Sequence, residues 1–262
     1  MQKPFACLCL AVVFHVGVAT AEEPFRAAAD RPVDIIHIKL NVDVSLKKKQ
    51  LAGTATIDLI PLRPVRTIRF NAVDFEVSGV LASRADDEQQ LKVPFDNTGK
   101  ELVLTFPTQL ATGSRWRVEI KYRVRNPRTG LHFFGPTKAE PDIPWMAWTQ
   151  GEAESNRYWF PCFDHPNERQ TTEIIATVDS RFEVLSNGTQ ISRKTLPDGK
   201  VRCHWLQAKP HVAYLVTLVV GEFAIGRDEW RGKPVLRSEE HTSELQSRRK
   251  LVCRLRLQKK KK

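Results

Sequence analysis

The chain has 262 residues, of which 41 are lysine or arginine and 30 are aspartate or glutamate, giving a formal net charge of +11. Ten of these basic and three of these acidic residues lie in residues 237–262, and residues 1–21 contain one lysine. Residues 22–236 therefore carry 30 basic and 27 acidic residues, a net charge of +3. A charge this small gives no ground for a nucleic-acid or anionic-membrane partner.

A basic start followed by an apolar run predicts a secretory signal peptide at residues 1–21. Lys3 is the only charge, the apolar run spans Phe5–Val18, and Ala19-Thr20-Ala21 supplies a small-x-small cleavage pattern. The run is shorter than the about 20 residues that a membrane-spanning helix needs. We expect a secreted or periplasmic protein with no membrane span after cleavage. A buried first helix is the alternative.

Residues 22–236 alternate apolar and polar residues, which predicts β-strands with one buried and one solvent-facing side. The clearest alternations are Ile36–Val44, Thr54–Leu59 and Trp116–Val124. Further strands are predicted at Thr67–Phe70, Glu101–Phe106, Thr172–Val178, Phe182–Leu185 and Val201–Leu206. Short strands at this spacing, without an amphipathic helix of three turns, predict one all-β domain: a sandwich or a strongly twisted pair of sheets.

Turn residues separate the predicted strands. Asn97-Thr98-Gly99 and Thr112-Gly113 mark two turns, and Asn187-Gly188 and Asp198-Gly199 predict tight hairpins. The long apolar run Tyr214–Val220 predicts a strand that is buried on both faces.

The segment Thr149–Pro166, TQGEAESNRYWFPCFDHP, places ionisable groups among aromatic rings. It resembles the signature of the M1 zinc aminopeptidases, the relatives of aminopeptidase N and leukotriene A4 hydrolase, which reads roughly TQ-x-E-x-x-x-A-R-x-x-F-P-C-F-D-E-P. Three further segments are similar to that family in the same order: Thr129–His132, Val184–Gly188 and Pro210–Phe223. The resemblance implies a saddle-shaped, sandwich-like antiparallel N-terminal β-domain that packs on a thermolysin-like catalytic domain.

Gln150 and Glu152 are the candidate substrate-binding residues. They are two apart, so on an extended segment both side chains project from the same face. The resemblance implies that Glu152 helps to hold the free α-amino group of a peptide and that Gln150 lines the pocket for its first side chain. A carboxylate that accepts from an ammonium forms a charge-assisted hydrogen bond. The alternative is that both are polar residues on a solvent-facing strand.

Arg157 is expected to pin the same loop. A planar guanidinium suits bidentate pairing with a carboxylate, and Glu154 and Asp164 are the nearby partners. His165 stands where family members usually have glutamate, and we assign it no role. The aromatic residues of the segment are expected to pack in the core or between domains: Tyr158, Trp159, Phe160 and Phe163.

The family's metal motif is missing from this sequence. None of the seven histidines belongs to an H-E-x-x-H pattern, and the family's G-A-M-E-N motif is absent. We therefore assign no catalytic or metal-binding residue to this chain and expect zinc in a catalytic domain that it lacks. A zinc site from Cys162, His165, Cys203 and His204 is disfavoured, because adjacent strand residues point to opposite faces. Cys162 and Cys203 either pair or stay as isolated buried thiols.

Residues 237–262 have the character of sequencing read-through. The ten residues from Arg237 to Gln246, RSEEHTSELQ, are the translation of AGATCGGAAGAGCACACGTCTGAACTCCAG, which looks like a common short-read adapter. The closing lysines are what an A-rich stretch would encode. A solvated basic tail is the alternative.

Together these features predict a signal peptide, an N-terminal β-domain at residues 22–236 and a non-native tail. The leading hypothesis is a truncated, exported M1-type zinc aminopeptidase, inactive as given, whose intact form binds peptide N-termini. The alternative is a free-standing secreted β-sandwich that binds peptide, glycan or protein without catalysis. A leukotriene A4 hydrolase-like branch with different substrate chemistry would share the same β-domain.

Overall fold

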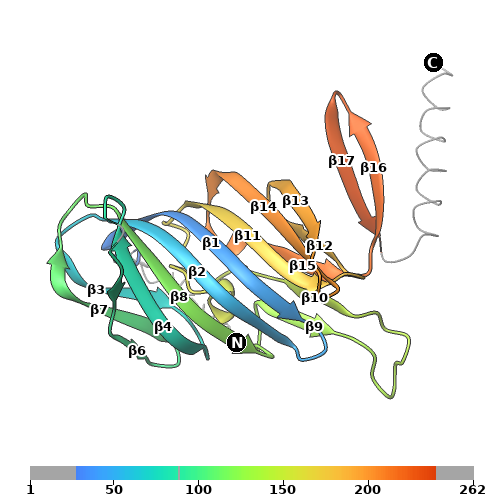
Figure 1. The fold of residues 1–262 in the computed structure, drawn as a ribbon, viewed down its shortest axis with the longest axis horizontal. Helices are drawn as coiled ribbons and strands as arrows, with labels where there is room; N and C mark the ends of the chain where they lie inside the picture. Colours follow the sequence, from blue (N-terminus) through green and yellow to red (C-terminus); the bar gives the residue numbers. More distant parts are fainter. Residues whose placement is uncertain (1–27, 88, 240–262) are drawn as a thin grey trace, which may run out of the picture.

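The computed structural model describes residues 28–87 and 89–239 and shows an all-β architecture, as the alternation predicts (Figure 1). Its largest element is a twisted eight-stranded sheet. In spatial order its strands are β13 (Thr189–Thr195), β14 (Lys200–His211), β11 (Gln170–Asp179), β1 (Val33–Ser45), β2 (Gln50–Pro61), β8 (Trp116–Arg125), β4 (Glu76–Arg84) and β5 (Leu91–Lys92).

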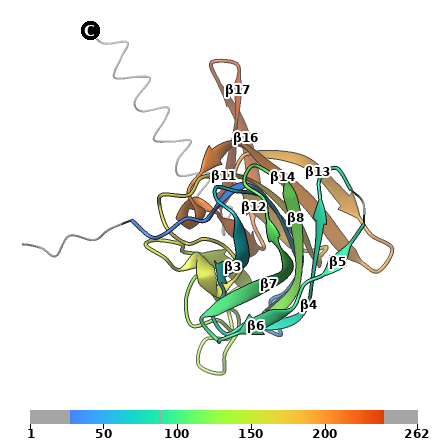
Figure 2. The ribbon, with the colours of Figure 1, turned by 90° about the vertical axis from the view of Figure 1, so that its left-hand side faces the viewer.

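Two smaller sheets lie at opposite ends of the large one (Figure 1). One has the order β3 (Val65–Asn71), β7 (Glu101–Leu110) and β6 (Phe95–Asn97). The other has the order β12 (Glu183–Ser186), β15 (Leu218–Gly221), β10 (Met146–Thr149) and β9 (Leu131–Phe134). A hairpin of β16 (Ala224–Trp230) and β17 (Lys233–Glu239) projects from the body, and Figure 2 views the three-stranded end.

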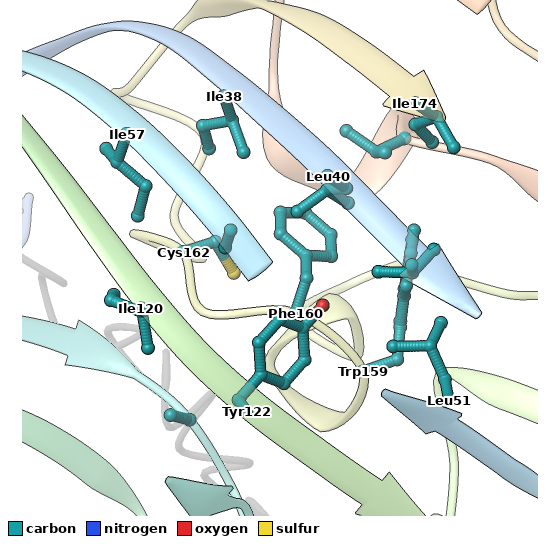
Figure 3. Packing of buried hydrophobic residues seen from close by; sticks show 14 of the residues in the cluster. Ile38, Leu40, Leu51, Ile57, Ile120, Tyr122, Trp159, Phe160, Cys162 and Ile174 are labelled. Atoms are coloured by element: carbon teal, nitrogen blue, oxygen red, sulfur yellow. The ribbon is translucent and has the colours of Figure 1, made fainter. Parts of the chain in front are cut away.

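The core lies on one face of the eight-stranded sheet. Ile38 and Leu40 of β1, Ile57 of β2 and Ile120 of β8 are each at most 1% exposed, whereas the residues between them face outward. Figure 3 shows Phe160 beneath these strands. Full burial of one such side chain contributes about 1.5–3 kcal/mol, so the alternation fixes which face of each strand points inward.

One strand pair departs from the antiparallel sheet that the resemblance implies. β1 and β11 are parallel, with His37 opposite Thr171 and Asp43 opposite Thr177. A parallel neighbour needs a crossover connection rather than a hairpin. Here β10 and the segment up to Arg169 lie between the first strands and β11 in the chain, so the crossover runs through the segment that carries the candidate site.

The prediction of one strand at Tyr214–Val220, buried on both faces, is wrong. Residues 213–215 form the 3₁₀ turn η2 (Ala213–Leu215), and the strand β15 begins only at Leu218. Side chains accept hydrogen bonds from the backbone here. The Asn187 Oδ1 accepts from the Thr217 N–H at 2.7 Å, and the Thr149 Oγ1 accepts from the Leu218 N–H at 2.9 Å. These bonds replace strand pairing before Leu218.

The two predicted hairpins have different outcomes. Asp198-Gly199 does join the antiparallel strands β13 and β14, with Gly199 at φ +74°. Asn187-Gly188 does not form a hairpin, because β12 pairs with β15 and β13 pairs with β14 in another sheet. Gly188 has φ +82°, so the glycine serves a turn at which the chain changes sheets.

Two sequence predictions lie outside the described residues. The signal peptide at residues 1–21 is one, and residues 240–262 of the predicted read-through are the other. The first three residues of that tail, Arg237 to Glu239, form the end of β17. Within the described part of the chain, no helix reaches the length and apolarity required to cross a membrane.

His211 is expected to make the stability of the fold depend on pH. Burial lowers the pKa of its imidazole, whose Nε2 lies 2.9 Å from the Thr172 Oγ1. Below the ordinary value of about 6.5, the unfolded chain binds a proton that the folded chain resists, so the free energy of unfolding falls as pH falls. One such group contributes at most about 1.4 kcal/mol per pH unit. Urea unfolding at pH 7.5 and 5.5 should show a smaller difference for His211→Gln than for the parent chain; equal differences would contradict this role.

Candidate functional site

The candidate site lies on the loop that leaves β10 and crosses beneath the eight-stranded sheet. After Thr149 the chain turns at residues 152–155, forms the 3₁₀ turn η1 (Asn156–Tyr158) and then runs against β3. Trp159 and Phe160 are fully buried, as expected for the rings of this segment. Their rings meet edge to face with centroids 4.6 Å apart. The loop is therefore anchored in the core on the far side of its exposed turn.

Asn156 is the polar centre of the loop and is fully buried. Its Oδ1 accepts from the Trp159 indole N–H at 2.7 Å. Its Nδ2 donates to the Ala213 carbonyl and, at 3.4 Å, to the Val216 carbonyl. One amide thus joins the loop to the turn η2 and satisfies a buried indole.

Two glycines allow the loop to pack this closely. A Cβ at Gly151 would overlap the Tyr214 carbonyl oxygen, and one at Gly130, where φ is +80°, would overlap the Ser155 carbonyl oxygen. The Gln150 N–H donates to the Gly130 carbonyl at 2.9 Å. The backbone around the candidate residues is therefore held by close contacts at Gly151 and at Gly130, which only glycine permits here.

Arg157 pins the loop as the sequence predicts. Its Nη2 donates to Glu154 Oε2 at 2.7 Å, and its Nε donates to Asp164 Oδ2 at 3.2 Å. Burial raises the pKa of Asp164, and the hydrogen bonds and charge of Arg157 oppose that rise. The side chain of Asp164 is only 1% exposed, so it depends on Arg157 for its charge balance.

Gln150 and Glu152 are both exposed. Within the described residues neither side chain makes a hydrogen bond or ion pair with the protein. The extended segment on which the shared face was predicted does not include Glu152, because β10 ends at Thr149 and Glu152 begins the turn. The Glu152–Ala153 peptide bond is cis. The arrangement presents an unpaired carboxylate and an unpaired amide from a firmly held loop.

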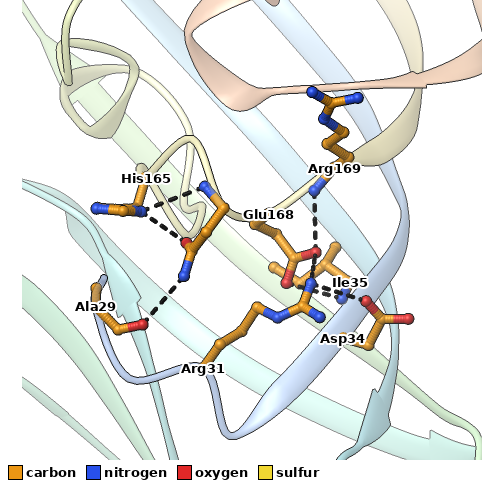
Figure 4. Close-up of polar contacts among 8 residues, drawn as sticks. Ala29, Arg31, Asp34, Ile35, His165, Glu168 and Arg169 are labelled. Atoms are coloured by element: carbon orange, nitrogen blue, oxygen red, sulfur yellow. Dashed lines mark hydrogen bonds and ion pairs between the residues drawn. The ribbon is translucent and has the colours of Figure 1, made fainter. Parts of the chain in front are cut away.

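Glu168 is a buried contact that sequence reasoning missed (Figure 4). Its carboxylate accepts from Arg31 Nη1 at 2.8 Å, from the Ile35 N–H at 3.2 Å and from the Arg169 N–H at 3.1 Å. Burial raises its pKa, and the Ile35 and Arg31 contacts oppose that rise. Glu168 ties the end of the loop to the start of β1. Its neighbours along the chain, Asn167 and Arg169, are polar and gave no sign of burial.

The cysteines are isolated thiols. Cys162 and Cys203 are both buried and free, and burial raises the pKa of each thiol. A raised pKa keeps a thiol protonated and poorly nucleophilic. His204 follows the buried Cys203 but lies on the outer face, with its Nε2 2.6 Å from Glu173 Oε1.

The donor set for a family zinc ion is not present in the described chain. Between residues 28 and 239, leaving out residue 88, no group of three or more His, Cys, Asp or Glu is arranged to hold a metal ion. These residues do not fit a zinc site, so no reaction step is assigned to a metal bound by them.

Comparison with known proteins identifies the family of this β-domain. Residues 35–215 match the model of the peptidase M1 N-terminal domain. Over 225 residues the chain is 25% identical to rat (Rattus norvegicus) aminopeptidase B, covering 79% of this chain and 34% of that protein. It is 28% identical over 190 residues to leucine aminopeptidase 2 of Candida glabrata, covering 72% of this chain and 28% of that protein.

Solved structures share the fold. A two-domain M1 zinc metallopeptidase bound to L-tryptophan superposes with a TM-score of 0.66 at 20% identity, over 82% of this chain and 49% of the other. The M1 zinc metallopeptidase from Deinococcus radiodurans gives a TM-score of 0.64 at 20% identity, over 82% and 48%. The chain thus spans about a third of the length of these curated relatives and about half of these solved chains. It belongs to the M1 peptidase family, and residues 35–215 are its peptidase M1 N-terminal domain.

Proposed function

We propose that this chain is the substrate-anchoring N-terminal domain of an exported M1 zinc aminopeptidase, in which Glu152 and Gln150 receive the amino terminus of a peptide. The observation that carries the proposal is the pair of exposed, unpartnered polar side chains on a loop fixed by buried bonds, within an M1 N-terminal domain. The names of the relatives, aminopeptidase B and leucine aminopeptidase 2, support peptides as substrates.

The chemistry of Glu152 suits this role. Its carboxylate accepts hydrogen bonds from an ammonium group, and such a charge-assisted contact contributes about 1.5–3 kcal/mol net. An internal peptide bond offers no ammonium, so the contact selects free amino termini. The Gln150 amide can donate and accept beside the first side chain. Because the loop is already fixed by Asn156 and Arg157, little ordering cost opposes binding.

The anchoring role predicts a binding defect in the enzyme encoded by the complete reading frame. Glu152→Gln removes the charge and keeps the shape, so KM for peptides and the Ki of amino-terminal inhibitors should rise about 10- to 100-fold. Glu140→Gln is the matched control, because Glu140 is also exposed and its side chain has no partner among the described residues. Unchanged KM and Ki in Glu152→Gln would exclude the anchor.

The proposal places the zinc-dependent chemistry on a domain outside this chain. Purified chain should therefore not hydrolyse aminoacyl chromogenic substrates; hydrolysis that a chelator inhibits would contradict the proposal. Long-read sequencing of the locus across codon 236 tests the same point. A frame that continues into H-E-x-x-H supports a truncated enzyme with residues 237–262 as read-through. A frame that ends with this tail supports the free-standing binding module instead.

A further inference from the structure

The edge of the three-stranded sheet has an unpaired strand. β3 pairs with β7 on one side, and the sheet ends there (Figure 2). On its other side only Asn71 is paired within the described chain: its N–H donates to the Cys162 carbonyl at 2.7 Å, and its carbonyl accepts from the Cys162 N–H at 3.2 Å. Beyond Cys162 the Asp164 N–H donates to the Asn71 Oδ1 at 2.9 Å, and in the described chain the loop makes no backbone hydrogen bond to Arg69 or Thr67.

Strand geometry shows which backbone groups this leaves free. In an antiparallel pair, successive residues direct their N–H and C=O groups alternately to the two sides. Since Asn71 points toward the free edge, Arg69 and Thr67 point the same way. Ile68 and Phe70 point toward β7. The N–H and C=O groups of Thr67 and Arg69 therefore lie on the free edge.

A groove runs along this edge. It has a volume of about 550 Å³, within the range of about 300–1,000 Å³ that is typical of ligand-binding clefts. Thr67, Arg69 and Asn71 of β3 line it together with Phe163 and His165 of the crossing loop. An edge with free backbone groups beside a groove is the arrangement that accepts an added strand.

The charges in the groove are already paired with one another. Arg63 bonds to Asp30, Arg69 to Glu101, and Arg157 to both Glu154 and Asp164. All seven of these residues line the groove. The three arginines and four carboxylates nearly balance, so the groove has little net charge to attract a charged ligand, whereas a main chain needs only the unpaired N–H and C=O groups. The pairing therefore favours a neutral occupant recognised through its backbone.

We propose that the free edge of β3 binds an extended, uncharged peptide segment, which adds to the three-stranded sheet as an antiparallel strand opposite Thr67 and Arg69. The segment continues the pairing that Cys162 begins at Asn71. Each of Thr67 and Arg69 exchanges two hydrogen bonds with the peptide backbone. The peptide must therefore be extended, but its side chains are not selected by these bonds. This site is independent of an anchor at Glu152, because it needs no free amino terminus.

The test uses the full chain and a blocked pentapeptide, acetyl-Thr-Val-Thr-Val-Thr-amide, which has no amino-terminal charge for Glu152 to bind. The expected result is slower hydrogen exchange at the amides of Thr67 and Arg69 and amide chemical-shift changes centred on β3. A peptide N-methylated on the two amides that face β3 should bind at least about fivefold more weakly, since each lost hydrogen bond costs about 0.5–1.5 kcal/mol. Methylation of the outward amides should have a smaller effect.

A pair of variants tests the same edge from the protein side. Thr67→Pro removes the edge N–H, which a free edge tolerates, and should weaken peptide binding about three- to tenfold. Thr67→Val keeps the N–H and should bind like the parent. The proposal is overturned if exchange at Thr67 and Arg69 is unchanged at millimolar peptide, or if both methylated peptides bind equally. Protection that grows with protein concentration alone would also overturn it, because the occupant would then be a second copy of the chain.

Discussion

Arg157→Met is expected to lower the free energy of unfolding by about 3 kcal/mol at pH 7, because it leaves the buried Asp164 carboxylate without its cation. Arg157 supplies both the charge and the Nε donor to Asp164, and the Asp164 side chain is only 1% exposed. Methionine keeps the apolar stem of the arginine, so the loss reports the charge. Urea denaturation followed by tryptophan fluorescence measures it.

The same variant has a predicted pH dependence. Burial raises the pKa of Asp164, and removing Arg157 takes away the groups that oppose the rise. With a folded-state pKa above the unfolded one, the folded carboxyl binds its proton more readily than the unfolded one, so lowering the pH favours the folded variant. The deficit relative to the parent should shrink as the pH falls from 7 toward 4.

Two controls isolate the buried pair. Arg84→Met breaks the exposed Arg84–Asp86 pair and should change stability by less than about 0.5 kcal/mol. The double variant Arg157→Met with Asp164→Asn should recover part of the loss, because it removes the stranded charge. A deficit in Arg157→Met that stays constant from pH 7 to 4, or no recovery in the double variant, would contradict this account.

The strands that can be predicted from the sequence are those in which burial alone decides the pattern. In β1, β2 and β8 one face is core and the other is solvent, so alternation gives both the strand and its orientation. The prediction fails at Tyr214–Val220, where the backbone forms hydrogen bonds with the side chains of Asn156, Asn187 and Thr149. Those partners lie 30–69 residues away in the chain, and no local pattern contains them.

The candidate site likewise has features that the sequence predicts and features that depend on the tertiary fold. The pairing of Arg157 with Glu154 and Asp164 is short-range and follows from residue types alone. The free edge of β3 depends on which strands are neighbours, and the parallel pairing of β1 with β11 sets the path of the crossing loop. Neither the free edge nor the path of the loop can be predicted from the alternation of apolar and polar residues. The buried positions of Asn156 and Glu168 likewise come from the tertiary fold.

Asn156→Leu is expected to be at least as damaging as the loss of Arg157, with a decrease of about 3–5 kcal/mol in the free energy of unfolding. Leucine keeps the branched shape of asparagine but is bulkier, and it leaves the Trp159 indole N–H and the Val216 carbonyl without this partner. The Ala213 carbonyl keeps only the bond from the Val216 N–H. Each unsatisfied buried group costs about 1–3 kcal/mol. Because the residue is fully buried, water cannot substitute without opening the loop.

Asn156→Asp separates the two halves of this amide. The carboxylate still accepts from the Trp159 N–H, but it faces the Ala213 and Val216 carbonyls with an acceptor in place of a donor. The defect should therefore be large at neutral pH and smaller at acid pH, where a protonated carboxyl can donate. Asn167→Leu is the matched control: its Nδ2 bonds to the Ala29 carbonyl at 3.1 Å in an exposed position, and the loss should stay below about 1 kcal/mol.

The consequence for the site follows from position. Asn156 joins the loop to η2, and Gly151 lies against the same turn, so loss of the amide frees the segment that carries Gln150 and Glu152. Hydrogen exchange at residues 150–155 should accelerate in Asn156→Leu before global unfolding occurs. If exchange there stays slow while global stability falls, Asn156 supports the core alone, and the candidate residues are held by Arg157 and the glycine contacts instead.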